Sequence, residues 1–281
     1  MKIGHYLLSG SLMPVFFLLT GFSCDRKIPS PGSSANDTLL IIYPGYRLVW
    51  QDEFNGTELR SADWNYETGG SGWGNNELEY YTSGNKNAYL LNGNLVIEAK
   101  KEVMGNRNYT SARITTAGKH EFQYGRIDIR AKLPVQTGMW PALWMLGNDI
   151  GSKGWPYCGE IDIMELIGKN PKQVVGSFHW KNDDGSEGTF NNRYDLANGD
   201  FSDDFHLYSL IWEKDQYQIL IDNQVYVSAK PSDIKAAYNP LNHPFYLLFN
   251  VAVGGDWPGS PDSSTAFPQK MLVDYVRVYQ H

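Results

Sequence analysis

Three acidic residues in one short segment have the types and the spacing for acid–base chemistry. In the segment from Gly159 to Glu165, acids alternate with large apolar residues, a pattern that predicts a β-strand with one polar and one buried face. In a regular strand Glu160 and Asp162 share a face, whereas Glu165 points to the other. A β-bulge, one extra residue between Asp162 and Glu165, would return Glu165 to the polar face. We therefore expect a bulged strand that presents three acids in a row.

Three acids on one face repel one another, so this arrangement favours catalysis over a purely structural role. With the bulge, Glu160 and Glu165 lie roughly 13 Å apart at their Cα atoms. Side chains that lean inward would leave their carboxyl groups ~5–5.5 Å apart, the gap of a retaining glycosidase. Asp162 can orient one glutamate, and its charge raises the pKa of a neighbour that must start protonated. An exposed acidic strand or a set of calcium ligands is the alternative interpretation.

The composition restricts the class of protein and its partners. Aromatic residues make up 14% of the 281 residues, and the formal net charge is -7. This charge argues against nucleic acid or an anionic membrane surface as a partner. The length fits one large all-β domain behind a leader. The two cysteines, Cys24 and Cys158, indicate no disulfide framework.

The N-terminal segment predicts export. Residues 1–23 contain an early lysine and an apolar stretch that is too short for a convincing membrane span, which is typical of a secretory leader. A small residue followed by Cys24 resembles the lipobox of bacterial lipoproteins, although Gly21 stands where a branched apolar residue is usual. We expect a lipidated Cys24 and an outer-membrane or cell-surface lipoprotein; ordinary cleavage would leave a free thiol. Residues 24–43 predict a flexible tether, and residues 44–281 the catalytic domain. Membrane contact is then expected only through the lipid anchor.

After residue 44, short strand-like segments alternate with turns rich in Gly, Asn and Pro. In Gly125–Leu133 the apolar residues face one way, while Arg126 and Asp128 face the other, which predicts a strand with one wet face. Tyr217–Val227 predicts a hairpin that turns at Asp222. Convincing amphipathic helices are absent from the pattern, so the sequence predicts an all-β sandwich.

The acidic segment resembles the E-I-D-x-x-E signature of glycoside hydrolase family 16, in its bulged, laminarinase-like form. The resemblance implies a β-jelly-roll sandwich of two antiparallel sheets with a substrate cleft on the concave face. It also implies an endo-glucanase that cleaves internal β-1,3 bonds of laminarin-like β-glucans with retention. The likeness covers about Tyr46 to Tyr279 and includes the segments Trp50–Phe54, Tyr66–Gly70, Asn75–Tyr81, Trp140–Trp144, Val253–Gly259 and Val273–Tyr279.

Geometry alone leaves open which glutamate attacks the sugar. The resemblance implies that Glu160 is the nucleophile, Glu165 the acid/base and Asp162 an assisting residue. Aromatic rings stack on the apolar faces of sugar rings while polar groups bind the hydroxyls. Single tryptophans are often core residues, and the polar positions could be a turn, an ion pair or a strand histidine. The cleft positions implied by the resemblance are Asn75, Arg113, Trp140, Trp144, His179 and Trp257.

We expect no cofactor for catalysis. The resemblance does imply a structural calcium ion held by Glu53, the backbone carbonyl of Gly93, and Asp274. Oxygen ligands from distant segments suit calcium, although both acids could also be ordinary strand-end residues. Cys158 lies among acids that would raise its thiol pKa, so we expect it to be inert.

The sequence leaves three functions open. The first is the β-1,3-glucanase, acting as a monomer on a β-glucan polysaccharide. The second is another hydrolase of the family, for mixed β-1,3-1,4-glucan or a galactan such as agar or carrageenan. The third is a β-glucan-binding lectin on the same fold, which would be expected to have lost one acid. Glu160, Asp162 and Glu165 are all present, which disfavours the lectin.

Overall fold

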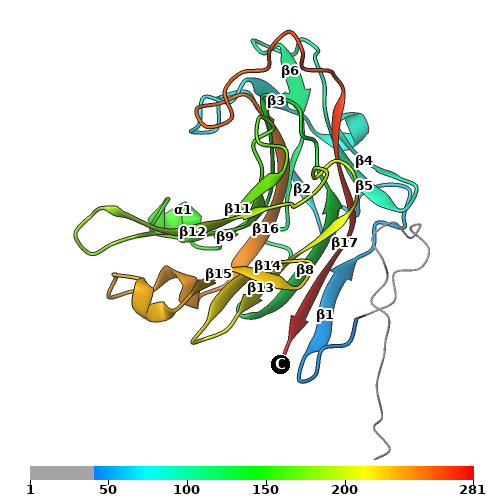
Figure 1. The fold of residues 1–281 in the computed structure, drawn as a ribbon. Coiled ribbons are helices and arrows are strands. Elements are labelled where there is room, and N and C mark those ends of the chain that lie inside the picture. The colour runs from blue at the N-terminus through cyan, green and yellow to red at the C-terminus, as the bar shows by residue number, and fades with distance from the viewer. Residues whose placement is uncertain (1–40) are drawn as a thin grey trace, which may run out of the picture. The chain divides into compact units, whose positions relative to one another are not determined.

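The computed structural model describes residues 41–281, and the predicted leader, Cys24 and most of the predicted tether lie outside the described residues. Two antiparallel sheets make up this part of the chain, and Figure 1 shows β9, β11 and β12 in one layer and β8, β13 and β14 in the other. Sheet A runs in the order β15 (Gln224–Ala229), β14 (Tyr217–Ile221), β13 (His206–Trp212), β8 (Gly125–Lys132), β17 (Gln269–Gln280), β5 (Asn94–Ala99) and β4 (Ala88–Leu91), with β1 (Arg47–Asp52) also paired to β17.

Sheet B carries the acidic segment. Its order is β12 (Glu187–Asp195), β11 (Gln173–Lys181), β10 (Glu160–Glu165), β9 (Met139–Gly147), β16 (Phe245–Val253), β7 (Arg113–Thr115) and β2 (Asn65–Glu67). A short parallel pair joins β3 (Glu79–Tyr81) to β6 (Tyr109–Ser111). The short helices are α1 (Ile150–Lys153) and three 3-10 turns at Gly84–Lys86, Pro231–Asp233 and Pro240–Asn242.

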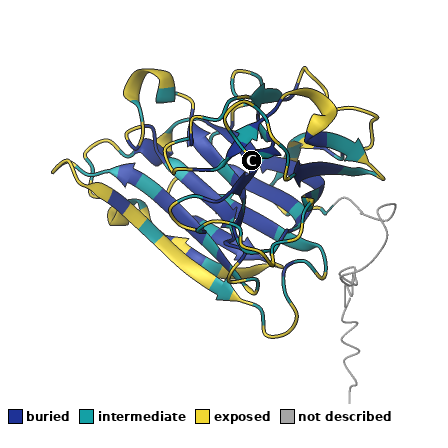
Figure 2. Ribbon diagram, turned by 90° about the horizontal axis from the view of Figure 1, so that it is seen from above, coloured by how far each residue is buried: buried dark blue, intermediate teal, exposed yellow. Residues whose placement is uncertain are grey.

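The core lies between the two sheets. Alternating apolar residues of β8, such as Ile127 and Ile129, are buried there, and every residue of β16 is buried. Figure 2 shows the buried residues concentrated in the inner strands, with exposed residues in the loops and along a strand at the edge. The expected all-β jelly-roll of two antiparallel sheets is confirmed. A hairpin also forms as predicted, because β14 and β15 pair around Asp222 and Asn223, whose φ angles of 46° and 65° suit a tight turn.

The outward face of β8 differs from the prediction. Arg126 is 5% exposed and Asp128 0%, so the expectation of a wet face is wrong for these residues. Asp128 accepts hydrogen bonds from Arg126 Nε (2.8 Å), Tyr43 Oη (2.6 Å) and Ser209 Oγ (2.6 Å). The Tyr43 ring lies 4.0 Å from the Arg126 guanidinium and covers it. This face is therefore a buried polar layer whose charges are paired.

Among the described residues, 41–281, no helix is long and apolar enough to cross a membrane.

Candidate active site

The predicted bulge is present in β10. Asp162 pairs with Ser177 of β11 and Glu165 with Val175, so three steps along β10 match two along its neighbour. The extra residue lets Ile163 and Met164 both be buried, each with 0% exposure. Glu160, Asp162 and Glu165 consequently all line one cleft over the outer face of sheet B.

This cleft has a volume of about 810 Å³. Besides the three acids, it is lined by each of the six residues that the family resemblance assigns to the cleft, which come from different strands and loops of sheet B and its surroundings. Those residues are Asn75, Arg113, Trp140, Trp144, His179 and Trp257. The structure therefore brings together every residue predicted for catalysis and for sugar binding.

Each of the two glutamates predicted to be catalytic accepts a hydrogen bond from an indole. Trp155 Nε1 donates to Glu160 Oε2 (3.1 Å), and Trp140 Nε1 donates to Glu165 Oε1 (3.0 Å). Trp140 lies on β9 beside β10, whereas Trp155 comes from the loop that leads into β10. An N–H donor stabilises the ionised form of a carboxyl group, so the two indoles oppose the effect of burial on the two glutamates.

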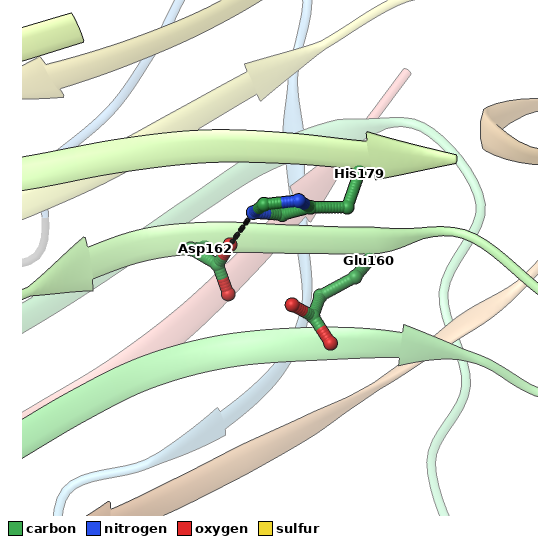
Figure 3. A group of neighbouring side chains, drawn as sticks. All are labelled: Glu160, Asp162 and His179. Atoms are coloured by element: carbon green, nitrogen blue, oxygen red, sulfur yellow. Dashed lines mark ion pairs between the residues drawn. The ribbon is translucent and has the colours of Figure 1, made fainter. Parts of the chain in front are cut away.

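His179 contacts the third acid. Its Nε2 lies 3.3 Å from Asp162 Oδ2, and its Nδ1 lies 3.3 Å from Glu187 Oε1. Figure 3 shows the imidazole over Asp162, with Glu160 beside them. His179 pairs directly with Glu160 across β10 and β11, which fixes the ring above the acids.

Burial raises the pKa of all three acids. It raises the pKa of Asp162 to about 8, and the pKa of Glu165 also to about 8, with the charge of Asp162 adding to the effect on Glu165. The pKa of Glu160 lies well above its usual value, first because of burial and then because of Asp162. His179 acts against this increase on both glutamates. Some of these carboxyls therefore keep a proton at neutral pH, as a general acid must.

Aromatic and cationic side chains form the wall of the cleft beyond Glu165. The guanidinium of Arg113 lies between the rings of Trp73 (4.9 Å) and Trp144 (4.7 Å) and pairs with Glu67. These contacts hold the Arg113 guanidinium in place on the wall of the cleft.

A second aromatic pair lies near Glu165. Trp140 meets Trp257 edge-on at 5.5 Å, and Trp257 remains 37% exposed, so part of its ring is free for a sugar. Flat apolar surface next to polar donors is the arrangement expected for a carbohydrate site.

Sequence reasoning missed several cleft residues. Trp155, Trp73, Glu187 and Asn250 all line the cleft. Trp155 had a signal, since it is a tryptophan in a loop with Gly154 and Pro156 just before the acids. Glu187 and Asn250 had none, because they reach the cleft only through the strand order of sheet B.

The predicted calcium ligands come from β17, which carries Asp274, and from the ends of two neighbouring strands. The registers of β1 and β5 against β17 place Glu53 and Gly93 close to Asp274. However, Arg277 donates to both carboxylate oxygens of Glu53 (2.7 and 2.8 Å), and Arg130 donates to Asp274 Oδ2 (2.7 Å). Calcium bound through these carboxylates would require both ion pairs to open. As the side chains lie, the set does not fit the ion, and calcium stays a prediction.

The surroundings of Cys158 agree with the expectation that its thiol is inert. Cys158 is buried, and burial raises its thiol pKa to about 12, which makes it a poor nucleophile. In residues 41–281 one group of three potential metal-ligating side chains comes together, formed by Glu160, Asp162 and His179 with their ligand atoms within 4.8 Å of one another. Two of these are the acids of the proposed chemistry.

Residues 75–277 match the sequence profile of the glycosyl hydrolases family 16. The chain belongs to this family. It is 42% identical to a beta-glucanase of Rhodothermus marinus, over 84% of this chain and 86% of that protein. It is 39% identical to glucan endo-1,3-beta-glucosidase A1 of Niallia circulans, over 92% of this chain but only 42% of that longer protein. The solved laminarinase catalytic domain of Thermotoga maritima superimposes with a TM-score of 0.78 at 46% identity, covering 84% of this chain and 98% of that domain. The predicted family is confirmed, and the protein is a glycoside hydrolase.

Proposed function

We propose that this protein is an endo-β-1,3-glucanase that cleaves internal bonds of laminarin-like glucans with retention of configuration. The bulge in β10 carries the proposal, because it brings Glu165 to the face that Glu160 and Asp162 already share, so that all three acids line one cleft. The relatives named as beta-glucanase, endo-1,3-beta-glucosidase and laminarinase support the choice of substrate. The exposed Trp257 and the stacked Arg113 supply the surfaces that a glucan needs.

The proposed reaction has two displacements. In the first, Glu160 attacks the anomeric carbon while Glu165 gives its proton to the leaving glycosidic oxygen, and a glycosyl-enzyme ester forms on Glu160. In the second, Glu165 takes a proton from water, the water attacks the same carbon, and Glu160 is released as a carboxylate. The two inversions together retain the configuration. All steps move protons and the glycosyl group among two glutamates, sugar and water, so they need no cofactor.

Asp162 and His179 act on the nucleophile in this proposal. Asp162 lies between the glutamates with its Oδ2 beside His179 Nε2 (3.3 Å). A proton held by Asp162 or His179 would favour the ionised form of Glu160, the form that attacks.

Two alanine variants test the assignment of roles. Glu160→Ala should abolish turnover, because no ester can form. Glu165→Ala should still be glycosylated by a substrate whose leaving group needs no proton, and azide should then release a β-glycosyl azide. Azide rescue of Glu160→Ala should give the α-azide. A β-azide from Glu160→Ala would reverse the roles, and inversion by the wild type would exclude the two-step mechanism.

A panel of polysaccharides tests the substrate. Laminarin should release reducing sugar fastest, ahead of mixed-linkage β-glucan, agar and carrageenan. Binding of laminarin without any release of sugar would instead indicate a lectin.

We further propose that the protein is exported as a monomeric lipoprotein anchored through Cys24. The leader pattern of residues 1–23 supports this proposal, together with the Pro- and Ser-rich segment that follows it.

A further inference from the structure

Two glutamates outside the proposed mechanism form a buried pair next to the cleft. Glu77 is 3% exposed and Glu79 0%, and the two carboxyl groups lie close enough for the charge of Glu77 to act on Glu79. Two ionised carboxylates offer only acceptors, so a hydrogen bond between these groups would need a proton on one of them. Glu79 Oε1 is buried, and no donor group from the described residues reaches it. A proton on Glu79 Oε1 would let this oxygen donate a hydrogen bond to the Glu77 carboxylate, so that neither buried group lacks a partner.

The surroundings place that proton on Glu79. Glu77 accepts hydrogen bonds from Tyr81 Oη (2.9 Å) and from Asn75 Nδ2 (3.2 Å), which favour its ionised form. The other oxygen of Glu79, Oε2, accepts the backbone N–H of Val253 (2.6 Å). Burial, followed by the charge of Glu77, raises the pKa of Glu79 well above its usual value.

From Glu77 a chain of hydrogen bonds with one direction leads to the cleft. Asn250 Nδ2 donates to Tyr81 Oη (3.1 Å), so the Tyr81 hydroxyl proton remains for Glu77. Asn250 Oδ1 in turn accepts from Trp144 Nε1 (2.8 Å), which also fixes which end of the Asn250 amide faces Tyr81. Trp144, Asn250 and Glu77 all line the cleft, whereas Tyr81 is fully buried.

From Glu79 a second set of bonds leads to the loop that carries Trp257. Val253 N, the donor to Glu79, ends β16 directly before this loop. The loop is also tied to Asn75, whose carbonyl accepts from Asp256 N (2.9 Å). Hydrogen bonds therefore link both Asn75 and the loop that carries Trp257 to the two acids.

We propose that Glu77 and Glu79 act as a carboxylate–carboxylic acid pair, with the proton on Glu79, that positions Asn75, Trp144 and the Trp257 loop for substrate binding. Both glutamates are positioning residues, because they act through side chains that meet the sugar. The inference rests on the proposed glucanase function. It makes the two neighbouring acids unequal, which a purely structural role for both would not require.

The test compares the two amide variants. Glu79→Gln keeps a donor for Glu77 and an acceptor for Val253 N, so kcat/KM for laminarin oligosaccharides should stay within about twofold of wild type. Glu77→Gln replaces one carboxylate oxygen by an NH2 group, which only donates, so one of the donors to Glu77 loses its acceptor. We expect KM to rise about tenfold, as for one lost hydrogen bond to a charged group, with kcat nearly unchanged.

A third variant and a control make the test decisive. Tyr81→Phe removes the donor to Glu77 and should raise KM in the same way, which keeps the proposal testable if Glu77→Gln fails to fold. Glu98→Gln is the matched control, since Glu98 is a buried glutamate (7% exposed) of sheet A that pairs with Lys100 and Lys270. It should lower the melting temperature and leave KM unchanged.

Three outcomes would contradict the inference. Equal losses in Glu77→Gln and Glu79→Gln would mean that the proton has no fixed place. Variants that lower only the melting temperature, as Glu98→Gln does, would mean that the pair is structural. Unchanged KM in Tyr81→Phe would break the link to Asn250. If wild type itself fails to hydrolyse any glucan, the proposed function fails instead, and the two failures are thereby distinguished.

Discussion

Removal of the indole N–H donors should shift the two limbs of the pH–rate profile separately. Trp155→Phe deletes the donor to Glu160, and Trp140→Phe deletes the donor to Glu165; each also replaces the indole by a smaller ring. An N–H donor favours the ionised carboxylate and lowers its pKa, so its removal raises the pKa of that glutamate. The nucleophile must be ionised and the acid/base protonated in the free enzyme. The acid limb of kcat/KM therefore reports mainly on Glu160, and the alkaline limb on Glu165.

The expected size follows from the strength of the bonds. A hydrogen bond to a charged group contributes about 1.5–3 kcal/mol, and one pKa unit corresponds to about 1.4 kcal/mol. Trp140→Phe should thus move the alkaline limb upward by about 1–2 units, starting from a Glu165 pKa of about 8. Trp155 is 47% exposed, so water can replace much of its bond. For Trp155→Phe we expect an upward shift of the acid limb of only about 0.5–1 unit.

The assay is kcat/KM on a soluble β-1,3-glucan oligosaccharide across the pH range in which each variant stays folded. Trp257→Phe is the control, because its ring meets Trp140 edge-on while the glutamates take their indole bonds from Trp140 and Trp155. It should lower kcat/KM without moving either limb. If Trp155→Phe moved the alkaline limb and left the acid limb in place, the roles of Glu160 and Glu165 would be reversed. Unmoved limbs in both variants would contradict the effect assigned to the N–H bonds.

Three further predictions concern stability and location. Asp128→Ala leaves Arg126 buried without its main partner, so the free energy of unfolding should fall by about 3–5 kcal/mol in urea denaturation, with activity of the folded protein retained; a loss below about 1 kcal/mol would contradict the buried pair. If calcium binds at Glu53 and Asp274, chelation should lower the melting temperature and leave the rate nearly intact, because a ligand bound only by the folded state stabilises it; a calcium-loaded sample that shows no shift would remove the site. Cys24→Ser should move the protein from the membrane fraction to the soluble fraction of its native host, since lipid chains provide the attachment; a wild type that is already soluble would contradict lipidation.

The chain's local pattern predicted the strands and the acidic site. Alternation in the segments that became β5, β8, β10 and β17 fixes which residues point toward the core, because the side-chain period of a strand is two. The bulge followed from the same parity, since Glu165 falls on the wrong face of a regular strand. The family motifs then indicated the cleft residues, which come from segments far apart in the sequence, and the structure brings all of them together.

Long-range contacts settle what covers each face and what meets each acid. Arg126 and Asp128 alternate as surface residues would, yet Tyr43 and Ser209 bury them, and no local pattern reports that covering. The pairing of His179 with Glu160 depends on the register of β10 against β11.

The same holds for the acid pair and for Trp155. Glu77 and Glu79 stand in a polar-looking segment, but Glu79 meets Val253, which is 174 residues further along the chain. Trp155 reaches Glu160 because its loop folds back over the cleft. Strand period is a local property that short stretches of sequence express, whereas the partners of a side chain depend on long-range register and packing. The pattern of amino acids was therefore enough to predict the acidic segment, its bulge and the residues that face the core, and the folded chain selected the neighbours that set the protonation and position of the acids.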